Sequence, residues 1–237
     1  MMYMKGDLRD QLAHLGRSVV RAGLVVGSGG NMSARIPGTD ECWVTATGSW
    51  LEQLDRTSFV RIRWDEPFPT DDRTSGETND NAFLVSPLGA AASTDIPAMP
   101  TSELALHLAV YRARRDATVV VHLHPQTVLL LEALGEPIRL ATTDHRYYLH
   151  EIGVVPFHPP GTAVLAAATA AAIGGGLNCV VLARHGCCVV ADSVELAHKR
   201  VLNLGEAAEL TYRALLLGRV AELAALPPGG TPAPGRI

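Results

Sequence analysis

Apolar residues recur at helical intervals near the N-terminus. Leu8, Leu12, Leu15 and Val19 follow one another every three or four residues. This spacing places side chains on one face of an α-helix. The pattern predicts an amphipathic helix over residues 8–22.

Short apolar runs between turn residues alternate with further helical patterns. Such runs, bounded by glycine, proline or polar clusters, are typical of buried strands. We expect strands at 32–36, 42–45, 60–62, 83–85, 119–124, 154–157 and 179–183, with Val189 and Val190 pairing beside the last. We expect further helices at 101–114, 125–134, 163–176 and 193–225, the last of them long or broken. This alternation predicts an α/β fold.

The domain organisation follows from chain length and from two irregular segments. A chain of 237 residues can bury a full core and is expected to form one domain over 1–226. Residues 65–99 are rich in Pro, Gly, Ser, Thr and Asp and are expected to form an insertion that is functional or mobile. Residues 227–237 are rich in Gly and Pro and are expected to be a disordered tail.

Charge and cysteine content narrow the functional classes. The net charge is −4, with 19% charged residues, so no basic surface predicts a nucleic-acid partner. The sequence contains no run of about 18 apolar residues, so no membrane span is expected. The first ten residues lack the apolar core of a signal peptide. The four cysteines show neither CxxC spacing nor a disulfide framework. We expect buried, reduced thiols in a cytoplasmic protein.

Two histidines stand at the end of the predicted strand 119–124. His122 and His124 are two positions apart, so on a strand both imidazoles project to the same face. His185 follows the other apolar run, 179–183, and is the best candidate for a third metal ligand, although a histidine there also suits a simple turn. Three neutral nitrogens leave a fourth coordination position open, as in catalytic zinc sites.

Glu103 is the candidate acid or base. Thr101 or Ser102 can cap the following helix, which would place Glu103 in its first turn, where an anion is favoured for structural reasons alone. Alternatively, Glu103 reaches the metal as a general acid/base or as a further ligand. His107 lies on the same helical face, and we expect it to support the site or pack in the core.

Three short segments carry the chemistry of an anion site. Gly29-Gly30-Asn31, Thr47-Gly48 and Thr101-Ser102 combine glycine turns or a helix start with exposed N–H groups. Such groups form cradles for phosphate. Glycine turns are common, so each segment by itself is weak evidence.

Taken in order, these motifs make the chain resemble the class II aldolase/adducin family over residues 8–212, especially its fuculose-phosphate aldolases and related sugar-phosphate aldolases. The motifs that carry the resemblance are Ser28-Gly29-Gly30-Asn31-Met32-Ser33, Thr47-Gly48, Pro100-Thr101-Ser102-Glu103, His122-Leu123-His124, Val154-Val155-Pro156-Phe157 with Pro159-Pro160-Gly161-Thr162, and Arg184-His185-Gly186. Their number, order and spacing make the match specific.

The resemblance implies a role for each matching position. His122, His124 and His185 match the metal ligands, Glu103 matches the catalytic acid/base, and one divalent ion per chain is implied, zinc first, with manganese, cobalt or iron as alternatives. The positions that match the substrate-phosphate site are Ser28, Asn31, Thr47, Gly48, Thr101 and Ser102. The implied fold is a three-layer α/β/α structure with a mainly antiparallel central sheet. The implied assembly is a homotetramer with active sites between subunits.

The implied reaction is the reversible retro-aldol cleavage of a small ketose phosphate through a metal-stabilised enediolate. A 3-oxo-tetronate 4-phosphate decarboxylase-like enzyme is the alternative, and the epimerase branch is disfavoured because it has Asp at the Glu103 position. An adducin-like scaffold without enzymatic activity is a further alternative, disfavoured because such proteins lack the three histidines. One departure concerns the family's proton-donating tyrosine from a neighbouring subunit, for which Tyr147, Tyr148 and His145 are the local candidates.

Overall fold

The computed structural model describes residues 3–64 and 98–223. The expected strand at 83–85 and the expected tail at 227–237 lie outside the described residues, as does nearly all of the 65–99 insertion. Within the described ranges, no helix combines the length and apolar character that crossing a bilayer requires.

A mixed sheet of seven strands forms the centre of the described structure. The strands are β1 (Gly30–Arg35), β2 (Glu41–Thr45), β3 (Phe59–Arg63), β4 (Val119–Leu123), β5 (Ile152–Val155), β6 (Cys179–Leu182) and β7 (Gly186–Ala191). Their order across the sheet is β3-β2-β1-β4-β7-β6-β5. Every neighbouring pair is antiparallel except β5 and β6. The predicted mainly antiparallel sheet is confirmed.

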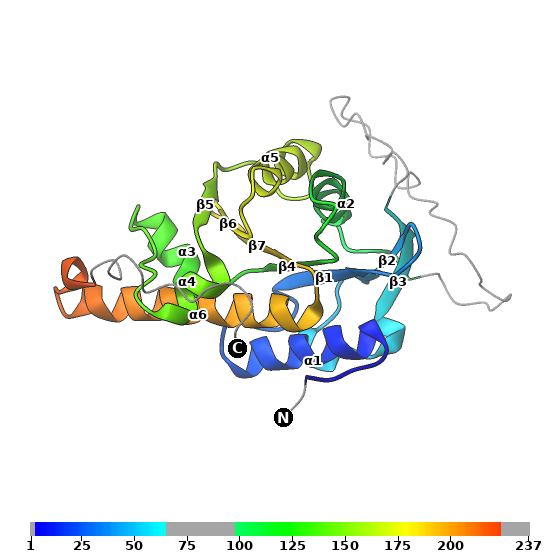
Figure 1. The fold of residues 1–237 in the computed structure, drawn as a ribbon, viewed down its shortest axis with the longest axis horizontal. Helices are drawn as coiled ribbons and strands as arrows, with labels where there is room; N and C mark the ends of the chain where they lie inside the picture. Colours follow the sequence, from blue (N-terminus) through cyan, green and yellow to red (C-terminus); the bar gives the residue numbers. More distant parts are fainter. Residues whose placement is uncertain (1–2, 65–97, 224–237) are drawn as a thin grey trace, which may run out of the picture.

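Helices cover both faces of this sheet, as Figure 1 shows. The helices are α1 (Leu8–Arg21), α2 (Leu104–Ala113), α3 (Gln126–Ala133), α4 (Thr143–Leu149), α5 (Ala163–Gly174) and α6 (Val194–Leu216), with short 3-10 turns η1 (Leu51–Gln53), η2 (Arg56–Ser58) and η3 (Val220–Glu222). Helices α2 and α5 pack together on one face, while α1 and α6 lie across the other (Figure 1). The expected α/β/α layering is therefore present.

Strand β4 shows how the sheet separates two apolar cores. Val119, Val121 and Leu123 belong to the core under α1 and α6, whereas Val120 belongs to the core under α2 and α5. This is the alternation of a pleated strand. By the same alternation His122 faces the α2/α5 side. All four cysteines are buried and unpaired.

Strand β5 begins two residues earlier than the predicted strand at 154–157. It pairs in parallel with β6 from Ile152 onward, and the Val155 carbonyl accepts the last bond, from the Ala183 N–H. Pro156 has no N–H with which to continue the ladder.

The helical predictions need two corrections. Helix α4 was not predicted, although Thr142 caps it by accepting a bond from the His145 N–H at 3.1 Å. The segment predicted as one long or broken helix over 193–225 forms α6, which ends at Leu216, and the separate turn η3. Gly218, with φ of 69°, ends α6 by adopting a left-handed conformation that suits glycine.

Candidate metal and active site

Three histidines from two strand ends meet at one place in the fold. His122 belongs to β4, His124 follows it directly, and His185 precedes β7. The ring centroids are 4.8 Å apart for His122–His124, 4.8 Å for His122–His185 and 5.1 Å for His124–His185. One ligand atom from each lies within 4.8 Å of the others. The structure thus brings together the three predicted metal ligands.

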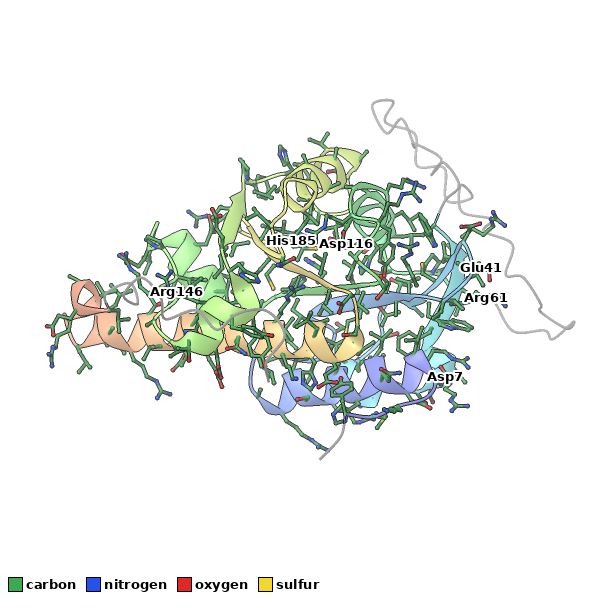
Figure 2. All side chains as sticks on the ribbon, viewed as in Figure 1. Asp7, Glu41, Arg61, Asp116, Arg146 and His185 are labelled. Atoms are coloured by element: carbon green, nitrogen blue, oxygen red, sulfur yellow. The ribbon has the colours of Figure 1, made fainter. Side chains whose placement is uncertain are left out.

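The strand that precedes His185 does not lie next to β4. This strand, β6, turns back into β7, which pairs antiparallel with β4. Antiparallel pairing sets the start of β7 beside the end of β4, with Leu123 opposite Cys187. Figure 2 shows His185 beside the sheet in the interior, far from Glu41 and Arg61 on the outer strands.

The turn that carries His185 is held by a neighbouring helix. Arg184 has a φ of 58°, an uncommon value for a residue with a side chain. Its backbone N–H donates to the Glu132 carboxylate of α3 at 3.0 Å. The His185 N–H closes the turn on the Leu182 carbonyl at 3.0 Å. Glu132 therefore stabilises the strained position next to a candidate ligand.

Gly186 permits the close packing of the imidazoles. A Cβ at this position would lie 2.5 Å from the Leu123 carbonyl oxygen, 2.8 Å from Cδ2 of His124 and 3.0 Å from Cε1 of His122. Any larger residue would displace the end of β4 or the two rings. The glycine after His185 is therefore needed by the site itself.

Burial favours the neutral form of all three imidazoles. Nδ1–H of His122 donates to the Cys187 carbonyl at 2.9 Å, which leaves Nε2 unprotonated in the neutral ring. Burial, followed by the nearby His124 and His185, holds the pKa of His122 well below its usual range. Burial and His185 lower the pKa of His124 to about 4, and burial lowers the pKa of His185. Neutral imidazole is the form that binds a metal.

The carboxyl group of Glu103 lies directly beside the histidines. Oε2 is 3.6 Å from Nε2 of His122 and 3.8 Å from Nε2 of His185. Oε1 accepts a bond from the Gly161 N–H at 2.7 Å. Burial raises the pKa of Glu103, and the Gly161 bond partly opposes that rise.

The backbone position of Glu103 corrects one expectation. Glu103 is the N-cap residue of α2 and not part of its first turn, and its side chain makes no capping bond. Thr101 accepts a bond from the Glu103 N–H at 3.3 Å, so the threonine shapes the entry to the helix. The Glu103 carboxyl group is thereby free to turn toward the histidines and the Gly161 N–H.

Two observations show that these residues suit a divalent cation. Oε2 of Glu103 and Nδ1 of His185 are buried without a hydrogen-bond partner among the described residues. Such groups are costly unless something satisfies them. Three neutral nitrogens with an adjacent carboxylate are the donor set of a catalytic zinc or similar first-row ion.

The predicted anion-binding segments lie around this centre. The Gly29 carbonyl accepts from the His124 N–H at 3.0 Å, and Asn31 lies opposite His122 in the β1–β4 pair. The other two segments lie side by side, because the Thr47 N–H donates to Met99 at 2.9 Å and the Thr101 N–H donates to Thr45 at 3.0 Å.

The exposure of the candidate phosphate residues varies. Ser28, Thr47, Gly48 and Ser102 are exposed, whereas Thr101 and Asn31 are buried. The Ser102 carbonyl is 3.2 Å from the point that a Cβ of Gly161 would occupy, so this segment also borders the Glu103 contact.

Helix α4 holds the three candidate proton donors at a different place. Tyr147 and Tyr148 are half-buried, with ring centroids 5.0 Å apart. His145 is buried at the wall of a cavity of about 680 Å³. Helices α4 and α6, the residues that follow α1 and the start of α3 line this cavity. Among the described residues of one chain, no hydrogen bond, ion pair or ring contact joins these three side chains to the metal-site histidines.

Comparison with known proteins identifies the family. The model of the class II aldolase and adducin N-terminal domain matches residues 10–212. The chain belongs to this family.

Two relatives show which reactions family members perform. A 3-oxo-tetronate 4-phosphate decarboxylase of Cupriavidus necator is 28% identical over 234 residues, covering 96% of this chain and 94% of that protein. An L-fuculose phosphate aldolase of Methanocaldococcus jannaschii is 28% identical over 209 residues, covering 88% and 98%.

A solved structure supports the fold of this class II aldolase family member. The l-fuculose-1-phosphate aldolase of Thermus thermophilus superposes with a TM-score of 0.69 at 21% identity, covering 89% of this chain and 96% of that one. The α/β architecture is therefore shared.

Sequence reasoning missed two residues that support the site. Gly161 donates to Glu103 although 58 positions separate them, and Glu132 holds the turn before His185 across 52 positions. Neither leaves a local signal in the sequence. The motif Pro159-Pro160-Gly161 marked a turn, but nothing in it indicated which side chain the turn would meet.

Proposed function

We propose that this protein is a metal-dependent carbon–carbon lyase that cleaves a small ketose phosphate by a reversible retro-aldol reaction. The observation that carries the proposal is the meeting of three neutral imidazoles with a buried carboxyl group, whose oxygen lies 3.6 Å from His122. A structural metal site would need no such acid beside it. An adducin-like scaffold role is disfavoured because all three histidines are present and packed together.

His122, His124 and His185 would hold one divalent ion, with zinc as the first candidate and manganese, cobalt or iron as alternatives. A bound ion would supply Lewis-acid stabilisation for negative charge that develops on the substrate's oxygens. The Nδ1–H bond from His122 to Cys187 fixes one ring for this task, as supporting hydrogen bonds do in metal sites.

Glu103 would move the proton. In the synthetic direction its carboxylate removes a proton from the carbon beside the substrate carbonyl, and in cleavage it returns that proton. Burial raises the pKa of Glu103, so the group is a stronger base than an exposed glutamate. The Gly161 N–H holds Oε1 and leaves Oε2 facing the reacting atoms.

The substrate phosphate would occupy the surrounding loops. Ser28, Asn31, Thr47, Gly48, Thr101 and Ser102 are the proposed contacts. Backbone bonds join the Thr47 and Thr101 segments to each other, and join the Gly29 segment to the strand end at His124, which supports one shared anion site. The donors would be hydroxyl groups, the Asn31 amide and the Gly48 N–H, since the N–H groups of Thr47 and Thr101 already donate to Met99 and Thr45.

Decarboxylation of a 3-oxo-tetronate 4-phosphate is the second candidate. The relative with that activity is as similar as the aldolase, at 28% identity, and covers more of this chain. Both reactions break a carbon–carbon bond and leave negative charge next to a carbonyl group. The same metal and acid therefore serve either one.

Assembly and setting are also inferred from the family. We propose a cytoplasmic homotetramer in which active sites lie between subunits. Among the described residues, none of Tyr147, Tyr148 and His145 makes a hydrogen bond, ion pair or ring contact with the three histidines of its own chain, which supports a role for one of them in a neighbouring subunit's site.

Product analysis separates the two reactions. The zinc-loaded protein is incubated with L-fuculose 1-phosphate or with a 3-oxo-tetronate 4-phosphate, and products are followed by ³¹P and ¹³C NMR with Glu103→Gln as control. We expect a triose phosphate and an aldehyde from the first substrate. Release of CO₂ from the second alone would move the assignment to the decarboxylase. Turnover of neither by the metal-loaded protein, across a panel of ketose phosphates, would contradict the proposed function.

A further inference from the structure

A line of four polar side chains runs from the edge of the metal centre into the core. Oδ1 of Asn31 lies 2.6 Å from Nε2 of His107, and Nδ1 of His107 lies 2.7 Å from the Ser33 hydroxyl. That hydroxyl lies 2.7 Å from the Tyr111 hydroxyl. Ser33, His107 and Tyr111 are fully buried, and Asn31 is 8% exposed. Buried polar groups linked in this way have one defined arrangement.

The chemistry of the groups sets the direction of each bond. Oδ1 of Asn31 can only accept, so Nε2 of His107 must carry the proton. Burial lowers the pKa of His107 to about 3, which keeps the ring neutral and leaves Nδ1 as an acceptor. The Ser33 hydroxyl then donates to Nδ1 and accepts from the Tyr111 hydroxyl. The Tyr111 hydroxyl also lies 3.4 Å from the Thr118 carbonyl, but the Ser33 oxygen is the nearer acceptor.

The far end of this line faces the candidate active site. Asn31 lies opposite His122 in the β1–β4 pair, and paired residues project to the same face of a sheet. Because Oδ1 is turned to His107, the amide NH₂ is turned away from it. Nδ2 has no hydrogen-bond partner among the residues that the structure describes. It is not fully buried, so a ligand can reach it.

We propose that His107, held by Ser33 and Tyr111, is a positioning residue that orients the Asn31 amide so that its NH₂ donates to an anionic oxygen of the substrate. This inference rests on the proposed function, because it gives the Asn31 amide the role of a donor at the substrate's anionic end. A free asparagine presents its oxygen or its nitrogen with similar ease. An oxygen turned toward an anion would repel it, so the orientation decides whether Asn31 helps or opposes binding.

The wild-type protein tests the assignment directly. Long-range ¹H–¹⁵N correlation spectra distinguish the two neutral tautomers of a histidine ring. We expect His107 to be the neutral Nε2–H form at pH 7, and still neutral at pH 5. An Nδ1–H form would reverse the whole line, turn the Asn31 oxygen outward and overturn the proposal.

Binding of inorganic phosphate, followed by calorimetry on the metal-loaded protein, tests the consequence. His107→Leu removes the donor to Asn31, and we expect the Kd for phosphate to rise about 10-fold or more, the scale of one hydrogen bond to a charged group. His107→Gln can place an amide N–H near the position of Nε2, and we expect it to remain within about 3-fold of wild type. Thr169→Val, which removes another fully buried hydroxyl on α5, is the matched control and should leave the Kd unchanged.

Kinetics separate positioning from general damage. We expect His107→Leu to raise KM for a phosphorylated substrate with kcat changed less than about 3-fold and metal content unchanged. Phosphate affinity in His107→Leu equal to wild type, or no phosphate binding by the wild type at millimolar concentration, would refute the proposal. If the leucine variant does not fold, the tautomer measurement still decides. If only the lyase assignment is wrong, the protein will turn over no substrate, but wild type will still bind phosphate more tightly than His107→Leu.

Discussion

The carboxyl group of Glu103 and the imidazole of His122 face each other across 3.6 Å, although one begins a helix and the other lies on the central strand. Oε1 of Glu103 accepts a hydrogen bond from the Gly161 N–H, and Nδ1–H of His122 donates to the Cys187 carbonyl. Each side chain is therefore oriented by a backbone group through an atom that is not part of the 3.6 Å approach. This opposed pair is the basis of the proposed chemistry.

Replacing Glu103 with glutamine separates proton transfer from metal binding. Glu103→Gln keeps the shape of the side chain and removes its acid–base function. We expect the variant to keep its metal and lose at least about 100-fold in kcat, the usual scale for a general acid/base. Steady-state rates beside elemental analysis provide the check. A variant that retained most of its activity would remove Glu103 from the mechanism.

A negative charge at Ser102 should oppose the substrate phosphate. Ser102 is exposed beside the Gly161 turn, so Ser102→Asp adds a charge without burying it. We expect KM for phosphorylated substrates to rise about 10-fold or more, since like charges at close range repel. Ala167→Asp adds the same charge at an exposed position of α5 and should leave KM unchanged. An equal KM in both variants would mean that the phosphate site lies elsewhere.

A methyl group at Gly186 should disturb the metal site. The Cβ of Gly186→Ala would meet the Leu123 carbonyl at 2.5 Å, which forces the strand end to move. We expect a loss of about 1–3 kcal/mol in unfolding free energy, as in other overpacked sites, and zinc binding weakened about 10-fold or more. Urea unfolding and competition with a chelator measure the two effects. Gly174→Ala is the control, because its Cβ would lie at an ordinary 3.4 Å from Ala113.

Acid should remove the stabilising effect of the charge on Asp7. Hydrogen bonds from Arg9 hold the pKa of Asp7 at about 2, whereas an unfolded aspartate titrates near about 3.9. A group whose pKa is lower in the folded protein stabilises it above the unfolded pKa, and the effect disappears as pH falls toward the folded pKa.

The substitution Asp7→Asn isolates this charge, since asparagine also caps helices well. We expect a loss of less than about 1 kcal/mol at pH 7, the scale of ion pairs near the surface. The difference in urea midpoint should shrink between pH 4 and pH 2. A pH-independent difference would show that the charge of Asp7 is not the cause.

Local sequence patterns predicted the parts of the fold that depend on one segment at a time. The stripe from Leu8 to Val19 gave a helix, and the apolar run before His122 gave the central strand. The two-residue spacing of His122 and His124 was enough to place both rings on one face. The face of a strand or helix on which a side chain lies depends only on its spacing from nearby residues.

The remaining features depend on contacts between distant segments. Helix α4 has an uneven apolar pattern and is stabilised through its packing on α6, so only its cap Thr142 gave a local signal. The approach of His185 to His122 requires the β6–β7 hairpin to turn back beside β4, and sequence did not reveal that strand order. The role of Glu103 likewise depends on Gly161, which is distant in the chain.

Metal content measured on the purified protein tests the central claim most directly. Elemental analysis compares the wild type, after exposure to zinc and removal of excess, with the double variant His122→Ala/His124→Ala. The account predicts about one equivalent of zinc or another first-row ion per wild-type chain, as a single site of three histidines holds, and its loss in the double variant. The claim would be contradicted if the wild type held no metal and took up none. It would also be contradicted if the double variant held as much metal as the wild type.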